Sequence, residues 1–227
     1  FLPGAPIVTI YLLSMPNPKN EKRFENVSKS KTFNNIVRAY DLDKKSVLDI
    51  GCTFGEFTAR FGPGSTGITI TPSEAAYGQE KGLDIRCGNI ESDTFDLDKT
   101  YDVIFANNLF EHLFSTHNFL RKIRTYLTPG GILILGVPVI PTIVPLLRFK
   151  KFQGSLSDAH INFFTRFTLI KTVEAGGWTP SVTRGFHFAH PLVDHLFDAV
   201  YPHFYVIATP NPSFTYSPKR MRELVGY

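Results

Sequence analysis

Apolar and polar positions follow two rhythms along the chain, and the two rhythms alternate. Short apolar or β-branched runs, typical of strands covered on both faces, occupy 46–50, 66–70, 83–87, 101–106 and 132–137. Between them lie segments with apolar residues at helical spacing, of which 116–127 is the clearest. Strands that alternate with helices in this way predict an α/β fold, with a mainly parallel sheet that is doubly wound.

Glycines and prolines bound the remaining elements. We expect helices over 29–40, 56–61, 72–81 and 165–175, and two late strands over 179–188 and 203–209. Pro72 suits a first helical turn, because the N–H that it lacks would have no partner there. Gly82 and Gly176 suit the ends of two of these helices.

Two stretches interrupt the alternation of strands and helices. The first, 138–163, is rich in proline, and the second, 186–202, is rich in aromatic residues and histidine. We predict an N-terminal leader and helix over 1–45, an α/β domain over 46–209 that carries both insertions, and a C-terminal tail over 210–227.

Composition narrows the class of protein. The 227 residues are 43% hydrophobic and 19% charged, which suits one globular domain, and 21 phenylalanines indicate a large aromatic core or an apolar pocket. Cys52 and Cys87 show neither metal-binding nor disulfide spacing, so we expect reduced thiols in a cytoplasmic protein. The apolar stretch 7–13 is short and follows no basic segment, so we expect neither a transmembrane segment nor a signal peptide.

The net charge of +4 is concentrated at 19–31, 148–151 and 219–222. Such patches can meet nucleic acid, anionic lipid or a phosphorylated substrate. No array of stacking aromatic residues accompanies them, so we predict solvated surface and expect no nucleic-acid partner.

The segment 47–55, VLDIGCTFG, predicts a ligand site. It reads as a buried strand, a turn containing Gly51 and Gly55, and a helix start whose N–H groups suit a nucleotide or a carboxylate. A dinucleotide-binding turn needs the pattern G-x-G-x-x-G, and Thr53 stands where the second glycine belongs, which argues against NAD and FAD. An ordinary strand-turn-helix of an α/β core is the alternative.

This segment resembles motif I of the class I S-adenosylmethionine (SAM)-dependent methyltransferases, with Asp49 as the acidic residue. Three later segments resemble the type 11/12-like small-molecule group of that family, in the expected order. The segment 101–113 resembles its "FD-x-I…EHL" stretch, 127–134 its "L-x-P-G-G-x-L" stretch, and 163–178 its "FFT-x-x-TL…AGF" stretch. The resemblance covers 46–178.

The resemblance implies a Rossmann-like, doubly wound seven-stranded sheet whose last strand runs antiparallel. It also implies SAM as the cofactor, bound at the carboxyl ends of the first four strands of a SAM-dependent methyltransferase domain. The cofactor-binding residues that it implies are Asp49, Gly51, Cys52, Thr53, Gly55, Thr69, Ile70, Asn89, Ile90 and Asn107.

One departure from the family pattern concerns the ribose. The family usually has Asp or Glu where Thr69 stands, and a hydroxyl offers fewer hydrogen bonds than a carboxylate. Thr71 can assist, and cyclopropane-fatty-acid-synthase-like enzymes carry a similar "G-I/V-T-L-S" segment, so SAM remains the expected cofactor. Asn89 replaces a common Asp, and its amide can still hydrogen-bond adenine.

The implied reaction is methyl transfer from the sulfonium of SAM to a small-molecule acceptor, and we expect O-methylation. Positioning of the acceptor supplies much of the rate, and a general base assists when the acceptor is a hydroxyl. His112 is the first candidate for a catalytic role and His160 the second; a structural hydrogen bond is the alternative for each. We expect Glu111 to anchor the local loop.

Two other functions stay open. RNA 2′-O-methyltransferases of the small-RNA 3′-end type bind a metal through an E-x-x-E-H segment and a later histidine; here Asn108 replaces the first carboxylate, so we expect no metal. The second is a non-catalytic SAM-binding module.

The apolar content of 137–152 and 186–204 favours an apolar or aromatic acceptor of the methyl group. A sugar hydroxyl as acceptor, core packing and a homodimer interface are the alternatives for these two segments.

Overall fold

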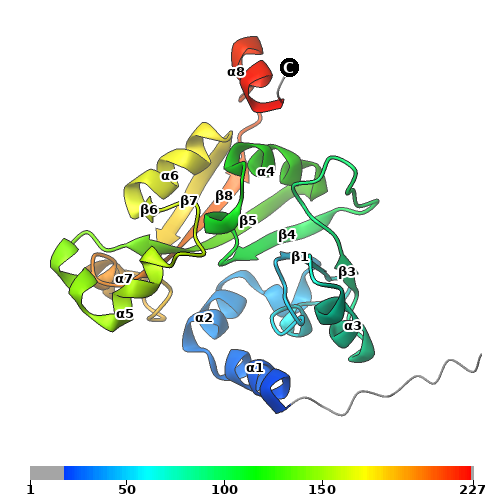
Figure 1. Ribbon diagram of the computed structural model, residues 1–227, viewed down its shortest axis with the longest axis horizontal. Helices are drawn as coiled ribbons and strands as arrows, with labels where there is room; N and C mark the ends of the chain where they lie inside the picture. The colour runs from blue at the N-terminus through cyan, green and yellow to red at the C-terminus, as the bar shows by residue number, and fades with distance from the viewer. Residues whose placement is uncertain (1–17, 226–227) are drawn as a thin grey trace, which may run out of the picture.

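A computed structural model describes residues 18–225, and a single mixed sheet forms its centre (Figure 1). The strands are β1 Val47–Ile50, β2 Thr66–Thr69, β3 Ile85–Cys87, β4 Tyr101–Asn107, β5 Leu127–Ile140, β6 Phe164–Thr165, β7 Trp178–Arg184 and β8 His203–Pro210. Their order is β3-β2-β1-β4-β5-β8-β7, and β6 pairs with β5 outside this path. Strands β1 to β5 are mutually parallel, whereas β8 runs antiparallel to β5 and β7. The Rossmann-like sheet with an antiparallel last strand is thus confirmed, and the expectation for 7–13 lies outside the described residues.

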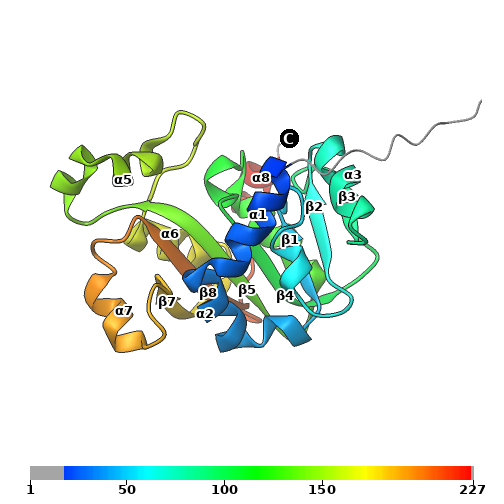
Figure 2. The ribbon, with the colours of Figure 1, turned by 90° about the horizontal axis from the view of Figure 1, so that it is seen from below.

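Helices cover both faces of the sheet (Figures 1 and 2). The helices of the described residues are α1 Pro18–Lys29, α2 Lys31–Tyr40, α3 Pro72–Glu80, α4 Thr116–Ile123, α5 Lys150–Gln153, α6 Arg166–Ala175, α7 Pro191–Phe197 and α8 Pro218–Val225. Along β4, Ile104 and Ala106 join the apolar cluster that includes residues of α4 and α6, while Val103 and Phe105 join the cluster that includes α2. Because successive strand residues point to opposite faces, β4 is buried on both sides.

The first of these clusters contains the only tryptophan of the chain. Trp178 is 2% exposed, and its indole N–H donates to the carbonyl of Leu120 at 3.1 Å. This bond joins the start of β7 to α4 and satisfies the polar atom of a buried aromatic side chain.

The turn after β1 differs from the prediction of a helix over 56–61. The backbone instead makes successive turns and one short 3-10 helix, η2 Thr58–Arg60. Gly51, Thr53 and Gly55 have φ values of 82°, 49° and 87°, so the backbone is left-handed at three positions just before the predicted helix. The side chains of Phe57 and Phe61 pack on the core ring of Phe33 with centroids 4.7 and 5.8 Å away, which holds the irregular segment in place.

Helix α1 falls in the segment for which an irregular leader is expected. It contains no buried residue, so it lacks the apolar stripe from which helices are predicted. Polar contacts attach it to the rest of the molecule: Arg23 forms a 2.6 Å ion pair with Glu56, and Glu21 forms a 2.7 Å ion pair with Lys81.

The two predicted insertions lie beyond the same end of the sheet (Figures 1 and 2). The first contains η5 Val144–Arg148, α5 and η6 Gly154–Leu156, and it begins after β5 has continued to Ile140. The second contains α7, and Lys151 of α5 lies 5.2 Å above the ring of Tyr201. Among the described residues, every helix falls short of the length and apolarity that crossing a membrane requires. The domain boundaries stay a prediction.

Candidate functional site

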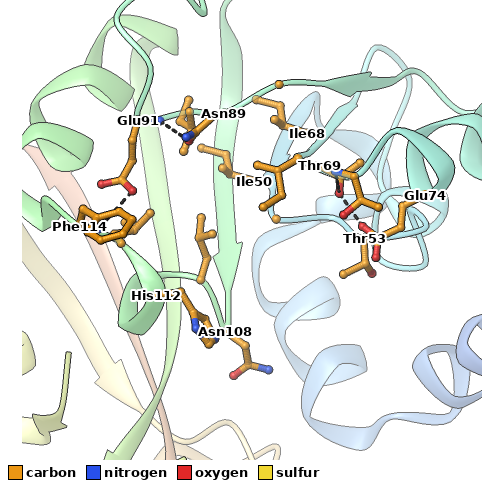
Figure 3. A pocket seen from close by; sticks show the side chains of 17 residues that line it. Ile50, Thr53, Ile68, Thr69, Glu74, Asn89, Glu91, Asn108, His112 and Phe114 are labelled. Carbon is orange, nitrogen blue, oxygen red and sulfur yellow. Dashed lines mark hydrogen bonds between the residues drawn. The ribbon is translucent and has the colours of Figure 1, made fainter. Parts of the chain in front are cut away.

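A pocket of about 410 Å³ opens at the carboxyl ends of β1, β2 and β4. In a parallel α/β sheet this edge is where ligands bind, because the strand order reverses there. The lining residues are Ile50, Gly51, Thr53, Ile68, Thr69, Ile70, Thr71, Glu74, Gly88, Asn89, Ile90, Glu91, Asn108, Leu109, His112, Leu113 and Phe114. Figure 3 shows Thr69 and Glu74 on one side of this pocket and Asn108 and His112 on the other.

Most of the residues predicted to bind SAM line this pocket. They are Gly51, Thr53, Thr69, Ile70, Asn89 and Ile90. Four others are absent from the lining: Asp49, Cys52, Gly55 and Asn107. All ten assignments stay predictions.

The turn after β1 brings backbone to the pocket. The N–H groups of Gly51 and Cys52 both donate to the carbonyl of Ile68 at 2.9 Å, which fastens the turn to β2. A methyl group on Gly51 would lie 3.3 Å from the side chain of Leu109, a close contact that glycine avoids. The left-handed Thr53 donates its hydroxyl to Glu56 at 2.8 Å.

The buried side chain of Asp49 stabilises the turn after β1. Its carboxylate accepts a hydrogen bond of 2.7 Å from the hydroxyl of Thr58, and the residue is 2% exposed. Burial raises the pKa of Asp49 to about 7, although the Thr58 bond opposes the rise. The side chain therefore joins β1 to η2 behind the pocket.

Glu74 is a lining carboxylate that the sequence reading missed. It stands in the first turn of α3, and its carboxylate accepts the hydroxyl hydrogen of Thr69 at 2.6 Å (Figure 3). The expected acid at the end of β2 is absent, yet a carboxylate reaches the same place from five residues later. The available signal was an acidic residue in the first turn of the helix that directly follows β2.

The loop after β3 forms another wall. The side-chain oxygen of Asn89 accepts the N–H of Glu91 at 2.9 Å. The carboxylate of Glu91 in turn accepts the N–H groups of Phe114 and Ser115 at 3.1 and 2.8 Å. These bonds tie the β3 loop to the loop after β4, and Phe114, 92% exposed, projects at the rim.

The end of β4 carries two asparagines with different orientations. The side-chain oxygen of Asn107 is buried without a hydrogen-bond partner among the described residues and lies beside Gly136. Asn108 has φ 52°, which turns its side chain to the pocket, where its oxygen accepts a 2.8 Å hydrogen bond from Nε2 of His203. Burial lowers the pKa of His203 to about 4, so this imidazole is neutral at physiological pH.

The two histidines predicted as catalytic lie together, with Glu111 between them and the core. The rings of His112 and His160 are 4.9 Å apart, edge to face. Glu111 is 1% exposed, and burial raises the pKa of its carboxyl to about 7. His112 lines the pocket and His160 does not.

The first insertion holds this pair in place. The carbonyl of Glu111 accepts the N–H groups of Ile161 and Asn162 at 3.0 and 2.9 Å, and the side-chain amide of Asn162 donates to the carbonyl of Leu113 at 2.7 Å. His160 is thereby fixed beside the 3-10 helix η3 Phe110–His112. Burial lowers the pKa of His160, with a smaller contribution in the same direction from His112.

Comparison with known proteins agrees with this architecture. The family described as a methyltransferase domain matches residues 20–181. Sterol 4-C-methyltransferase strm-1 of Caenorhabditis elegans is 35% identical over 94 residues, which are 37% of this chain and 28% of that protein. A ubiquinone biosynthesis O-methyltransferase of Rickettsia conorii is 26% identical over 105 residues, which are 42% of this chain and 36% of that protein. The matched region therefore spans about a third of the length of these relatives.

Solved structures share the fold. The crystal structure of an S-adenosylmethionine-dependent methyltransferase from Clostridium acetobutylicum superposes with a TM-score of 0.63 at 10% sequence identity, covering 86% of this chain and 99% of that one. The family match extends over more than half of the chain and includes the pocket at the ends of β1, β2 and β4. The chain therefore belongs to the methyltransferase-domain family.

Proposed function

We propose that the enzyme transfers the methyl group of SAM to a hydroxyl of an apolar or aromatic small molecule. The observation that carries the proposal is the position of His112, which lines the donor pocket and is paired with His160 from the first insertion. A hydroxyl must lose its proton as it is methylated, so a neutral imidazole beside the donor suits O-methylation.

We infer the donor site as follows. The backbone at Gly51 and Thr53 would face the methionine part of SAM, and Asn89 with Ile90 would face the adenine. Glu74, together with Thr69, would accept the ribose hydroxyls, because a carboxylate beside a hydroxyl supplies the acceptors that Thr69 alone lacks.

The four predicted residues outside the lining would shape this site without facing the ligand. Asp49, Cys52 and Gly55 hold the turn after β1, and Asn107 lies in the last position of β4. Their substitution would act on the donor through the position of the backbone.

The tautomer of His112 suits a proton acceptor. A carbonyl oxygen can only accept, so the 2.9 Å bond between Nδ1 of His112 and the carbonyl of Ala159 places the ring proton on Nδ1. When the ring is neutral, Nε2 then carries a lone pair. In the reaction the acceptor oxygen would bond to the methyl carbon, the S–CH₃ bond would break with its electron pair left on sulfur, and the hydroxyl proton would pass to Nε2 of His112.

Exposed apolar side chains near the histidines support an apolar acceptor. Phe114 lies at the rim of the pocket, and Ile161 and Phe163 are each 50% exposed just beyond His160. The two relatives described above are named for sterol and ubiquinone chemistry, which is consistent with acceptors of this kind, whereas three others are named as N-methyltransferases.

A methyl-transfer screen tests the proposal. The purified chain is incubated with SAM labelled in its methyl group and with pools of phenols, other alcohols, amines and short RNA, and products are identified by mass spectrometry. We expect label in a phenolic or other hydroxyl compound. Label only in amines, or only in RNA 2′-hydroxyls, would refute the proposed acceptor class.

The role of His112 is tested with the identified acceptor. We expect His112→Ala to lower kcat by about 10²- to 10⁴-fold, the usual effect of removing a general base. Calorimetry with the demethylated product of SAM shows whether donor binding is retained. Undiminished turnover by His112→Ala would exclude the histidine from proton removal.

A further inference from the structure

Three atoms with lone pairs converge beside the pocket. Oε1 of Glu111 lies 3.8 Å from Nε2 of His112 and 4.0 Å from Nε2 of His160. One potential ligand atom from each residue lies within 4.8 Å of the other two. Both carboxylate-to-imidazole distances are too long for hydrogen bonds, so the three atoms surround a gap.

The carboxylate of Glu111 has no partner of its own. Both of its oxygens are buried and lack a hydrogen-bond partner among the described residues. A buried ionised carboxylate is costly unless a cation or several donors compensate it. The backbone carbonyl of the same residue, in contrast, accepts two N–H groups, so the residue is firmly held while its side chain faces the histidines.

One of the histidines is oriented as metal ligands usually are. A histidine that binds a metal through one nitrogen commonly donates its other N–H to a carbonyl, which fixes the ring and the tautomer. His112 does this through Nδ1 and the carbonyl of Ala159, which leaves Nε2 as the lone-pair donor.

We propose that Glu111, His112 and His160 bind one divalent transition-metal ion, for which Zn²⁺ is the test ion. Two imidazoles and one carboxylate suit zinc, whereas Mg²⁺ and Ca²⁺ prefer oxygen ligands. Ligand atoms at about 2.0–2.2 Å from a tetrahedral zinc stand roughly 3.4 Å apart, so small side-chain shifts would close the observed gap. Asn108 takes no part, because its oxygen faces His203.

The ion would act on the acceptor, and this role rests on the proposed function. Three protein ligands leave a fourth position open, as in catalytic rather than structural zinc sites. Since His112 also lines the pocket, the open position adjoins the donor. The ion would polarise the acceptor hydroxyl so that in the zinc-bound enzyme its proton leaves to water. The lone pair on Nε2 of His112 cannot bind zinc and a proton at once, so His112 would act as the base only in the metal-free enzyme.

Metal binding is measured directly, without turnover. The full chain is stripped with a chelator, dialysed, and titrated with Zn²⁺ by calorimetry and by thermal unfolding. We expect one zinc ion bound per chain and a higher Tm in the presence of zinc. Glu111→Gln and His160→Ala should each weaken zinc binding by more than about 10-fold, since even removing the partner of a ligand has that effect.

A matched control separates this cluster from other histidines. His190 is exposed at the start of α7, outside the cluster, so His190→Ala should bind zinc as the wild type does. Circular dichroism verifies that each variant is folded. Equal zinc affinity in the wild type and in folded Glu111→Gln, or no zinc binding by the wild type, would overturn the site.

The outcome is distinguishable from failure of the proposed function. If the wild type does not bind zinc and still methylates a hydroxyl acceptor at the full rate in the presence of chelator, the metal site is refuted and the proposed function stands. If zinc binding depends on Glu111 but no hydroxyl compound is methylated, the proposed acceptor class is refuted and the metal site stands. Calorimetry with SAM on the stripped chain reports the donor pocket independently of both.

Discussion

At the scale of single residues, the pocket at the carboxyl ends of β1, β2 and β4 receives a carboxylate from an unexpected position. Glu74 belongs to α3, yet its side chain bonds the hydroxyl of Thr69 at the end of β2. The hydroxyl of Thr69 and the carboxylate of Glu74 therefore form one polar group at the wall of the pocket. The end of the pocket that we propose to hold the ribose therefore has a carboxylate that Thr69 alone would not supply.

Replacement of this carboxylate should weaken donor binding. A hydrogen bond to a charged group contributes about 1.5–3 kcal/mol, so we expect Glu74→Gln to raise the Kd for SAM roughly 10- to 100-fold in calorimetry. Asp93→Asn removes the same charge from an exposed position outside the pocket and should leave the Kd unchanged. A Glu74→Gln variant with wild-type affinity would show that ribose binding does not use this residue.

The buried Asp49 should make stability depend on pH. Its pKa rises from 3.8 to about 7 on folding, so the folded chain holds more protons than the unfolded chain between these values. Stability from this group is then full below about pH 4 and is lost as the pH rises towards 7, at up to about 1.4 kcal/mol per pH unit. Urea unfolding of Asp49→Asn at pH 5 and pH 7 should show a smaller decline than the wild type shows.

A second carboxyl should make stability depend on pH in the opposite direction. Hydrogen bonds from Ser46 hold the pKa of Asp102 below its usual value, so its contribution is present at neutral pH and lost as the pH falls. Asp102→Asn should therefore leave the decline between pH 5 and pH 7 in place. Identical pH slopes for the wild type and Asp49→Asn would contradict the assignment to Asp49.

At the scale of elements, the turn after β1 determines where backbone meets ligand. Gly55 has φ 87°, and a methyl group there would lie 2.8 Å from the side chain of Leu83. We expect Gly55→Ala to destabilise the chain by about 1–2 kcal/mol or more, because both the left-handed backbone and the contact penalise it. Urea unfolding at constant pH measures this loss.

Two other glycines serve as controls for this prediction. Gly82 also has a left-handed φ of 79°, but a methyl group there would meet no atom within 4 Å. Gly82→Ala therefore isolates the backbone strain. Gly154, with φ −59° and open space, should tolerate alanine without loss. A Gly55→Ala variant as stable as Gly154→Ala would contradict the packing argument.

The main elements could be predicted because their patterns are local. Apolar runs and the bounding glycines and prolines identified β1, β2, β4 and α3 within a few residues of their observed bounds. The turn over 51–60 and helix α1 could not be predicted in this way. The turn depends on packing against Phe33, and the helix depends on ion pairs with residues far along the chain. Neither cause leaves a periodic signal.

At the scale of the whole molecule, the pocket depends on contacts between distant segments. Asn108, which the sequence reading assigned no cofactor contact, faces the pocket because its left-handed backbone departs from strand geometry and His203 of β8 holds its amide. Glu74 was missed for a related reason, because the contact joins a strand end to the next helix. Sequence order indicates which strand ends meet, but not which of two adjacent side chains turns inwards.

The attachment of the first insertion to η3 gives a prediction at this scale. Asn162 donates to the carbonyl of Leu113, and its neighbour His160 lies beside Glu111. We expect Asn162→Ala to lower kcat about 10-fold or more with little change in the Kd for SAM, because it misplaces His160 and not the donor walls.

Steady-state kinetics with the identified acceptor, together with SAM calorimetry, separates these quantities. Asp158→Ala changes an exposed residue of the same loop and should leave both unaltered. An equal loss of SAM affinity and of kcat in Asn162→Ala would indicate a general loss of structure at the pocket.

The single buried tryptophan gives these measurements an internal signal. Trp178 is 2% exposed and bonded to Leu120 in the core between α4 and β7, and it is absent from the pocket lining. Its fluorescence in the folded chain should be emitted at the short wavelengths typical of an apolar environment, and should shift to longer wavelengths when the core opens. Donor binding should leave that emission nearly unchanged. Intrinsic fluorescence can therefore follow unfolding of every variant in the presence of SAM or zinc, without interference from occupancy of the site.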